Sequence, residues 1–471
     1  MPQKIDADIC IIGAGSGGLS VAAGAAQLGR KVVLVEKGKM GGDCLNFGCV
    51  PSKALIAAAK RAQEIREAGI FGIASSAPAI DFAAVMNHVH SVIAEIAPHD
   101  SVERFEGLGV TVIQAPGAFS GPRSVTAGDA EISAKHFVIA TGSSPFVPPV
   151  DGLDGIPFLT NETIFDLRTR PERLIILGGG PIGVEMAQAF RRLGSEVTLV
   201  EADKLLNRED GEAVSLVRQK LIGEGVYIHE NAKAVRAARS GDKISLTLQN
   251  GEAVEGSHLL VAVGRRANLS GLHLEKAGVA LENGKLRLDA RLRTANKRVF
   301  AIGDAAGGMQ FTHVAGDHAS TLVRNILFKA PAKRRDAFAP RVTYCDPEIA
   351  TIGMTEAEAA RKGETFTVAR WGFADNDRAR AERSTDGWIK VLIGKSGSIL
   401  GAAIVGENAG DLIALWSFAI ANRLKIRTIT NMIAAYPTRS EISKRAAGAY
   451  YTPTLFSDRT RGLVKMLSTF D

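Results

Sequence analysis

The chain has 471 residues, 46% of them hydrophobic and 23% charged, and a formal net charge of +7. This length predicts about three domains, and the ordinary composition excludes a disordered or fibrous chain. Four Cys residues are too few for the disulfide framework of a secreted domain, and the small basic excess favours anionic ligands such as nucleotides. We therefore expect a cytoplasmic protein with no nucleic-acid partner.

The first predicted unit, residues 7–36, combines a strand, a glycine-rich turn, a helix and a second strand. An apolar run stops at Gly13, an Ala-rich segment follows, and the second strand ends at Glu36. In Gly13-x-Gly15-x-x-Gly18 the first glycine makes the turn, the second lets the backbone approach a pyrophosphate, and the third allows close helix–strand packing. A carboxylate at the end of the second strand can accept hydrogen bonds from ribose hydroxyls. The order predicts a dinucleotide site.

The same unit recurs over residues 173–201. An apolar strand is followed by Gly178-x-Gly180-x-x-Gly183, a helix and a strand that ends at Glu201. Two dinucleotide sites in one chain favour two different dinucleotides, a tightly held flavin and a diffusing nicotinamide that carries hydride to it.

The second acidic residue also bears on nucleotide choice. The Glu201 carboxylate would repel a 2′-phosphate, so we predict NAD(H) in preference to NADP(H). Lys204 and Arg208 follow closely and would soften that preference if they face the nucleotide instead of solvent.

Other elements follow from the apolar patterns along the chain. We predict helices over 53–68, 82–106 and 411–422, a β-rich stretch over 110–139, and strands over 258–263, 299–302, 388–393 and 399–405. The region after about residue 340 has no glycine-rich turn and therefore resembles a separate interface domain.

Cys44 and Cys49 lie in the segment GGDCLNFGCVPSKAL. Pro51 suits the first turn of a helix, and both a helix N-terminus and a nearby Lys53 lower a thiol pKa. One helical turn can bring two Cα atoms within disulfide reach. The alternatives are two small buried hydrophobes or half of a metal site. No second Cys or His pair has ligand spacing, so we predict no resident metal.

These motifs together resemble one family. GGDCLNFGCVPSKAL, with GAGSGG before it and GGGPIGVE, AVGRRAN and AIGDAAG after it, is similar to the class I pyridine nucleotide-disulfide oxidoreductases, which include dihydrolipoamide dehydrogenase, glutathione reductase and mercuric reductase. The resemblance implies an α/β fold with two Rossmann-like domains and an α+β dimerisation domain. It implies an FAD domain over 1–150 and 268–338, an inserted NAD domain over 151–267, and a dimerisation domain with a C-terminal tail over 339–471.

The resemblance also implies roles for individual residues. Cys49 would be the flavin-proximal thiol and Cys44 the interchange thiol, while Lys53 and Glu185 would form an ion pair beside the flavin. The implied FAD contacts are Gly13, Gly15, Gly18, Glu36, Gly42, Lys53, Gly117, Thr141, Gly142, Gly303, Asp304 and Thr312. The implied nicotinamide-nucleotide contacts are Gly178, Gly180, Gly183, Glu201, Gly264 and Arg265.

The chain departs from the family near its end. Disulfide reductases carry His-Pro-Thr followed by Glu, and the partner subunit's His is the acid/base of the interchange thiol. Here Tyr436 takes the His place, with Glu441 after it. A phenol is a poor base near neutral pH, so we expect slow lipoamide turnover unless Tyr436 only packs. Mercuric reductases share the Tyr but add a Cys pair near the C-terminus, and no Cys follows Cys345 here, so we expect no metal transfer through tail thiols.

We therefore predict a homodimeric FAD- and NAD(P)H-linked oxidoreductase with a shared active site. Its acceptor is left open between a small disulfide or lipoyl group and a thiophilic metal ion. The alternatives are a flavin diaphorase or oxidase that reduces quinone or oxygen, and a non-catalytic subunit of a multienzyme complex. The tail carries a helical pattern over 457–468, which we expect to dock on the partner subunit rather than on a membrane.

Overall fold

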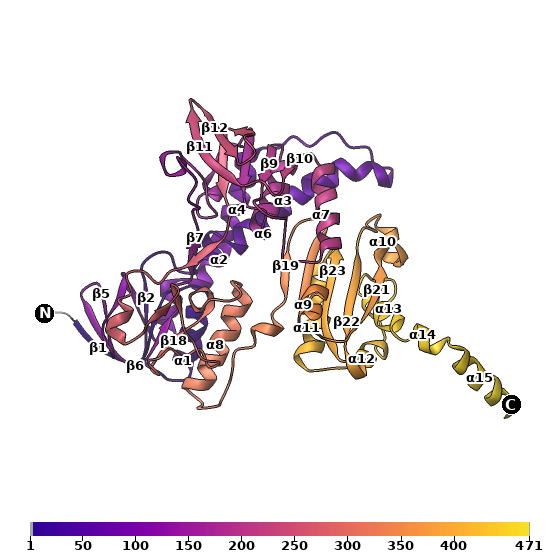
Figure 1. Ribbon diagram of the computed structural model, residues 1–471. Coiled ribbons are helices and arrows are strands. Elements are labelled where there is room, and N and C mark those ends of the chain that lie inside the picture. The colour runs from indigo at the N-terminus through magenta and orange to yellow at the C-terminus, as the bar shows by residue number, and fades with distance from the viewer. Residues whose placement is uncertain (1–2, 471) are drawn as a thin grey trace.

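The computed structural model describes residues 3–470 and contains three main sheets, here called A, B and C (Figure 1). Sheet A has the order β3-β2-β1-β6-β5-β4, with β18 added beside β6. Its strands are β1 (Gln3–Ile12), β2 (Val32–Glu36), β3 (Val110–Gln114), β4 (Gly117–Gly121), β5 (Ser124–Ala127), β6 (Ala130–Ile139) and β18 (Val299–Ala301).

The centre of sheet A is parallel, which suits its Val- and Ile-rich strands because helices cover both faces of such a sheet. β1 starts at Gln3, four residues before the predicted start, since its first residues pair with β6. Helix α1 (Ser16–Gln27) packs against α8 (Thr312–Ile326). α1 begins directly after Gly15.

Sheet B repeats the parallel pattern in the order β10-β9-β8-β14. Its strands are β8 (Arg173–Leu177), β9 (Glu196–Val200), β10 (Val226–His229) and β14 (His258–Val261), and its helices are α6 (Pro181–Arg192) and α7 (Gly211–Gly223). An antiparallel sheet of β11 (Ala234–Ser240), β12 (Lys243–Leu248) and β13 (Ala253–Gly256) lies beside it. The apolar pattern of residues 234–256 did not predict this sheet.

Sheet C is antiparallel, with the order β19-β20-β23-β22-β21. It contains β19 (Arg341–Thr343), β20 (Glu348–Gly353), β21 (Thr367–Gly372), β22 (Trp388–Ile393) and β23 (Ile399–Gly406). Helices α11 (Ala409–Ala421) and α13 (Glu441–Ala449) pack on it, and α9 (Glu356–Arg361), α10 (Asp377–Ala381) and α12 (Ile426–Thr430) complete this part. The predicted strand over 388–393 is confirmed, and the other elements agree within a few residues.

Four further helices lie between β2 and β3 in the sequence. They are α2 (Gly42–Asn46), α3 (Cys49–Glu67), α4 (Phe82–Ile96) and α5 (Val102–Gly107). The single helical region predicted over 82–106 is interrupted, because a 3₁₀ turn with Pro98 near its start separates α4 from α5. β7 (Ser143–Pro145) pairs with β15 (Arg265–Ala267), and β16 (Leu281–Glu282) pairs with β17 (Lys285–Leu286).

The C-terminal tail projects away from the rest of the chain (Figure 1). It consists of α14 (Thr452–Leu455) and α15 (Asp458–Leu467), which confirms the predicted tail helix. Its apolar side chains are exposed, including Phe456 at 62% and Val464 at 60%. Within residues 3–470, no helix combines the length and apolar character needed to cross a membrane.

Candidate active site

The two glycine-rich turns are built alike. Gly13 and Gly178 adopt φ values of 109° and 118°, and a Cβ on either would lie within 2.4 Å of a carbonyl oxygen on the adjoining strand. A Cβ on Gly18 or Gly183 would lie 1.9 Å from the carbonyl oxygen of the first glycine of its own turn. Only glycine fits these four positions, because the turn, strand and helix approach one another so closely.

The two acidic residues occupy equivalent places. Glu36 accepts a hydrogen bond from the Ala14 amide at 2.6 Å, and Glu201 accepts one from the Gly179 amide at 2.6 Å. Each carboxylate therefore braces its glycine turn at the end of the second strand. This position is where a carboxylate binds the ribose of a dinucleotide in a Rossmann fold.

The surroundings of the first turn fit an FAD pyrophosphate. Gly15 caps α1, and within residues 3–470 no side chain caps that helix, so its first amides are available to an anion. A Cβ on Gly42 would lie 2.7 Å from the Gly15 Cα, and one on Gly117 would lie 3.0 Å from a methyl carbon of Val35. The close backbone approach keeps side chains away from the helix N-terminus.

The second turn has the same character at the start of α6. Gly180 caps that helix, and no described side chain supplies a cap there either. Gly142 and Gly264 both have positive φ, and a Cβ on either would meet no described atom within 4 Å. Both positions leave open space beside the backbone.

Other predicted cofactor contacts directly follow β6 and β18, which are neighbouring strands of sheet A. Asp304 accepts a hydrogen bond from the Ser143 hydroxyl at 2.5 Å, and burial raises the pKa of Asp304. Thr141 donates to the Asn268 carbonyl at 2.7 Å, and the Gly303 amide donates to a ring nitrogen of His318.

Arg265 binds a set of groups that the sequence analysis had not connected with it. Its guanidinium donates to the Ser143 hydroxyl at 2.7 Å and to the Asn161 side chain at 3.1 Å, and it forms an ion pair with Asp43 at 2.9 Å. Asp43 belongs to α2, the helix that carries Cys44. Arg265 therefore ties β15 to the cysteine segment.

The two predicted redox cysteines lie on different helices. Cys44 is inside α2 and Cys49 is the first residue of α3, because the chain breaks at Phe47 and Gly48. The expectation that one helical turn carries both thiols was therefore wrong. Both cysteines are free thiols.

The pair is electrostatically asymmetric. The hydrogen bond from the Cys44 thiol, followed by Thr312 and Lys53, lowers the pKa of Cys49 to about 6. The same thiol–thiol hydrogen bond, together with burial, raises the pKa of Cys44. Thr312 begins α8, and its hydroxyl lies 3.4 Å from the Cys49 sulfur. In the dithiol state Cys49 is therefore the thiolate.

Lys53 and Glu185 form the predicted ion pair, with nitrogen and oxygen 2.9 Å apart. Burial opposes the lysine charge, but Glu185 outweighs it and raises the pKa of Lys53. The Lys53 ammonium nitrogen lies 4.4 Å from the centroid of the Tyr344 ring, a cation–π contact. Tyr344 was not among the predicted site residues. The Tyr344 amide also donates to Glu185 at 2.9 Å.

A cavity of about 350 Å³ borders Cys44 and the first turns of α1. Cys44, Val50 and Thr312 lie in its lining, and α1 supplies Ser16 and Leu19. Its lining also contains the charged residues Asp100 and Arg104.

Tyr436 and Glu441 lie beside sheet C, whereas the cysteines lie on α2 and α3. The Tyr436 side chain is 69% exposed, and its hydroxyl donates to Asp377 at 3.1 Å. This hydrogen bond raises the pKa of Tyr436. Glu441 binds Arg445 at 2.9 Å instead. Asp377 was not predicted as a partner of Tyr436.

Two histidines of α8 are bound to groups outside the cysteine pair. His313 is bonded to the Pro340 carbonyl, and His318 lies fully buried between the Gly303 amide and Asp336. Over the described part of the chain, His, Cys, Asp and Glu side chains form no cluster of three or more that could hold a metal ion.

Comparison with known families decides the identity of this site. The sequence profile described as pyridine nucleotide-disulphide oxidoreductase matches residues 7–319, and that family's dimerisation-domain profile matches residues 339–447. The chain belongs to the pyridine nucleotide-disulphide oxidoreductase family. It is an α/β flavoprotein disulfide reductase, and enzymes of this family use FAD and NAD(P)H.

Curated relatives cover the chain almost completely. A mercuric reductase from Streptomyces lividans is 36% identical over 454 residues, covering 94% of this chain and 96% of the relative. A dihydrolipoyl dehydrogenase from Geobacillus stearothermophilus is 34% identical over 454 residues, with the same two coverages.

Solved structures agree with this family. LpdA from Mycobacterium tuberculosis matches with a TM-score of 0.87 and 27% identity, covering 95% of this chain and 99% of that one. The Cu(II) complex of the HOCl-induced flavoprotein disulfide reductase RclA from Escherichia coli matches with a TM-score of 0.84 and 27% identity, covering 94% and 99%. The antiparallel sheet C corresponds to the dimerisation domain.

Proposed function

We propose that this enzyme is an FAD-dependent, NADH-linked reductase. It passes electrons through Cys44 and Cys49 to a thiophilic metal ion, which is its substrate. The proposal depends on one observation, which is that Tyr436 stands at the position of the family's catalytic His. Its phenol donates a hydrogen bond to Asp377, which raises the pKa of Tyr436 further from neutrality. A metal acceptor needs no proton from that position.

The chain's own residues would bind the two nucleotides at the duplicated turns. FAD would lie along the first turn and would supply two-electron transfer from NADH to the Cys44–Cys49 disulfide. Lys53 and Glu185 would stand beside the flavin, and Glu201 would bind the ribose of NADH and repel a 2′-phosphate. The proposal includes an FAD domain over 1–150 and 268–338, an NAD domain over 151–267 and a dimerisation domain from 339.

The thiols would then complete the electron transfer. Reduction of the disulfide adds two electrons and yields Cys44 and Cys49 as a thiol–thiolate pair. Binding of a metal ion to both sulfurs releases the remaining thiol proton. The two thiolates then give up two electrons and re-form the disulfide, so one Hg²⁺ ion takes both electrons or two Cu²⁺ ions take one each.

A disulfide substrate would lack an efficient acid/base at position 436. A thiol that leaves a lipoyl or glutathione disulfide needs a proton donor and the attacking thiol needs a base, which imidazole provides near neutral pH. Tyr436 would reach the site from the partner subunit of a homodimer, as the matched dimerisation domain favours. Two relatives support a metal acceptor. One is RclA, whose matched structure is a Cu(II) complex, and the other is the mercuric reductase from Streptomyces lividans.

The test is an anaerobic acceptor panel with the FAD-loaded enzyme. NADH oxidation is followed with Hg²⁺, Cu²⁺, lipoamide, glutathione disulfide and a quinone, each in parallel with Cys44→Ser. We expect metal-dependent turnover at pH 7 that the Cys44→Ser variant loses. Rapid lipoamide or quinone turnover with no metal turnover would overturn the proposal.

A further inference from the structure

One face of α6 is attached to the segment that connects β19 and β20 of sheet C. Glu185, Gln188 and Arg192 are spaced three and four residues apart, so their side chains lie on one face of the helix. All three bind the segment 344–346, which precedes β20. Gln188 on the helix and Asp346 in this segment are 158 residues apart in the sequence.

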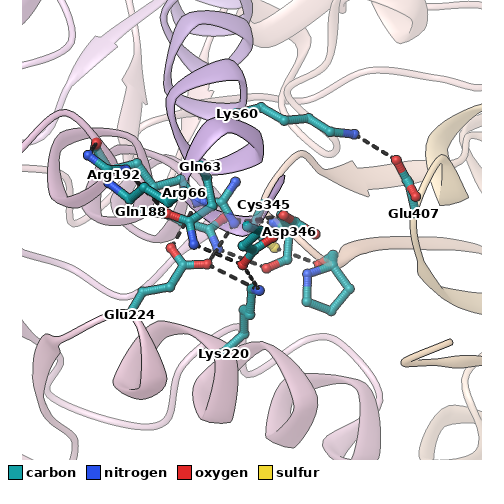
Figure 2. Close-up of polar contacts among 12 residues, drawn as sticks. Lys60, Gln63, Arg66, Gln188, Arg192, Lys220, Glu224, Cys345, Asp346 and Glu407 are labelled. Carbon is teal, nitrogen blue, oxygen red and sulfur yellow. Dashed lines mark hydrogen bonds and ion pairs between the residues drawn. The ribbon is translucent and has the colours of Figure 1, made fainter. Parts of the chain in front are cut away.

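The contacts run along the helix in order. Glu185 accepts the Tyr344 amide at 2.9 Å. Gln188 makes a reciprocal pair with the Asp346 backbone, since its oxygen accepts the amide at 2.7 Å and its nitrogen donates to the carbonyl at 2.8 Å. Arg192 donates to the Asp346 carboxylate at 2.7 Å. Figure 2 shows Gln188 and Arg192 grouped about Asp346.

Gln188, Arg192 and Asp346 are here called the clamp, and its two side chains on α6 are buried. Gln188 is 3% exposed and Arg192 is 4% exposed. Arg192 also binds Glu224 through two hydrogen bonds, at 2.6 and 2.8 Å, so its guanidinium is fully oriented. Buried, bidentate Arg–carboxylate pairs hold one geometry, because breaking them leaves an uncompensated charge.

We propose that Gln188, Arg192 and Asp346 are positioning residues for the Lys53–Glu185 ion pair. They attach the C-terminal half of α6 to the segment 344–346. In that segment the Tyr344 amide donates to one carboxylate oxygen of Glu185, and Lys53 binds the other. This clamp keeps the Glu185 carboxylate 2.9 Å from the Lys53 ammonium. The inference rests on the proposed function, in which that ion pair stands beside the redox pair.

The readout is the pH at which the Cys49 thiolate forms in the reduced, FAD-loaded protein. The thiolate is measured by its ultraviolet absorbance as a function of pH, after the absorbance of the Cys49→Ser variant has been subtracted. Cys10 and Cys345 do not interfere, because burial raises the pKa of Cys10 to about 12 and that of Cys345 well above its ordinary value. The Lys53 charge is one of the causes that lower the Cys49 pKa, so the midpoint reports on the ion pair.

Four variants separate positioning from general stability. Glu185→Gln removes the partner of Lys53 directly, and Asp346→Ala and Gln188→Met each break the clamp. Arg218→Gln is the matched control, because Arg218 makes a bidentate pair with Glu230 at 2.7 Å for both bonds and lies on α7.

We expect Glu185→Gln to lower the Cys49 midpoint by roughly 0.5 to 1 pH unit, since the Lys53 charge is then uncompensated. Asp346→Ala and Gln188→Met should shift it in the same direction by part of that amount. Arg218→Gln should lower the Tm without moving the midpoint. If Glu185→Gln shifts the midpoint and both clamp variants leave it unchanged, the positioning role is overturned. If Glu185→Gln has no effect, the role of the ion pair in the proposed function falls as well.

Discussion

At the residue scale, the chemistry of this enzyme depends on an asymmetry between two thiols. Hydrogen bonding from the Cys44 thiol leaves Cys49 with a pKa of about 6. Cys10 and Cys345 are buried and have raised pKa values, so they take no part in thiol chemistry near neutral pH. Two of the four cysteines are thus reactive and two are core residues.

The first prediction concerns the Cys49 thiolate. The two-electron-reduced enzyme should show a long-wavelength charge-transfer absorbance between this thiolate and oxidised flavin, and Cys49→Ser should abolish it. Because the Cys49 pKa is lowered to about 6, the thiolate is present above that pH and the absorbance should fade as the pH falls through it. Cys10→Ala should keep the band. A band that survives in Cys49→Ser would show that another donor produces it.

The second prediction concerns Tyr436. Tyr436→His should raise lipoamide turnover at pH 7 about tenfold or more, because imidazole is a far better base than phenol there. Asp377 lies within hydrogen-bond reach of position 436, whereas Glu441 is engaged with Arg445. Asp377→Asn added to Tyr436→His should therefore reduce the gain, and Glu441→Gln added to it should not. Rapid lipoamide turnover by the unmutated enzyme, undiminished in Tyr436→Phe, would contradict this.

The sequence could predict the glycines and the cysteine pair because their chemistry needs fixed local spacing. It could not predict that Asp377 binds Tyr436, since 59 residues separate the two and only folding brings them together. Tyr344 was missed for the same reason, because its partners Lys53 and Glu185 come from two other elements.

At the scale of elements, the duplicated turn was the best-predicted feature. A strand, a glycine turn and a helix are contiguous in the chain, so their order is visible in the sequence. The break between α2 and α3 was not predicted, because it depends on Gly48, where an added Cβ would lie 2.8 Å from an Asp43 carboxylate oxygen. That close contact exists only in the folded loop.

The third prediction concerns the second turn. Glu201→Gln should keep the hydrogen bond from the Gly179 amide but lose the repulsion of a 2′-phosphate. The ratio of kcat/KM for NADH to that for NADPH should therefore fall by about tenfold. Glu196→Gln, at the exposed start of the same strand, is the control and should leave the ratio unchanged. A wild-type preference for NADPH would contradict the proposal and would direct attention to Lys204 and Arg208.

At the scale of the whole molecule, sheet C is joined to the α7 region through polar contacts that the sequence does not reveal. Arg341 binds Glu209 at 3.0 Å, and the buried Lys390 binds Asp210 at 3.0 Å, so sheet C is fastened to the start of α7. The family resemblance implied which domains exist. The pairings between them depend on side chains more than a hundred residues apart, whose contacts have no periodic pattern in the sequence.

The exposed apolar side chains of the C-terminal part argue for a second subunit. Ile433 is 97% exposed and Phe418 is 61% exposed, and both lie within the matched dimerisation domain. Burying such side chains against a partner is favourable by about 25 cal/mol per Å² of apolar surface. Ile433 also lies three residues before Tyr436, so the same contact would carry the phenol toward the partner's site.

The fourth prediction tests this dimer. Ile433→Glu should raise the dimer dissociation constant about tenfold or more in sedimentation velocity, because a charge would be buried at the interface. Tyr227→Glu is the control, since Tyr227 is 67% exposed on sheet B, outside the dimerisation domain, and should leave the constant unchanged. Lipoamide turnover by Tyr436→His should fall on dilution in step with dissociation once Ile433→Glu is added, because each site would lose the imidazole that the partner supplies. A monomer that retains full activity at low concentration would refute the shared site.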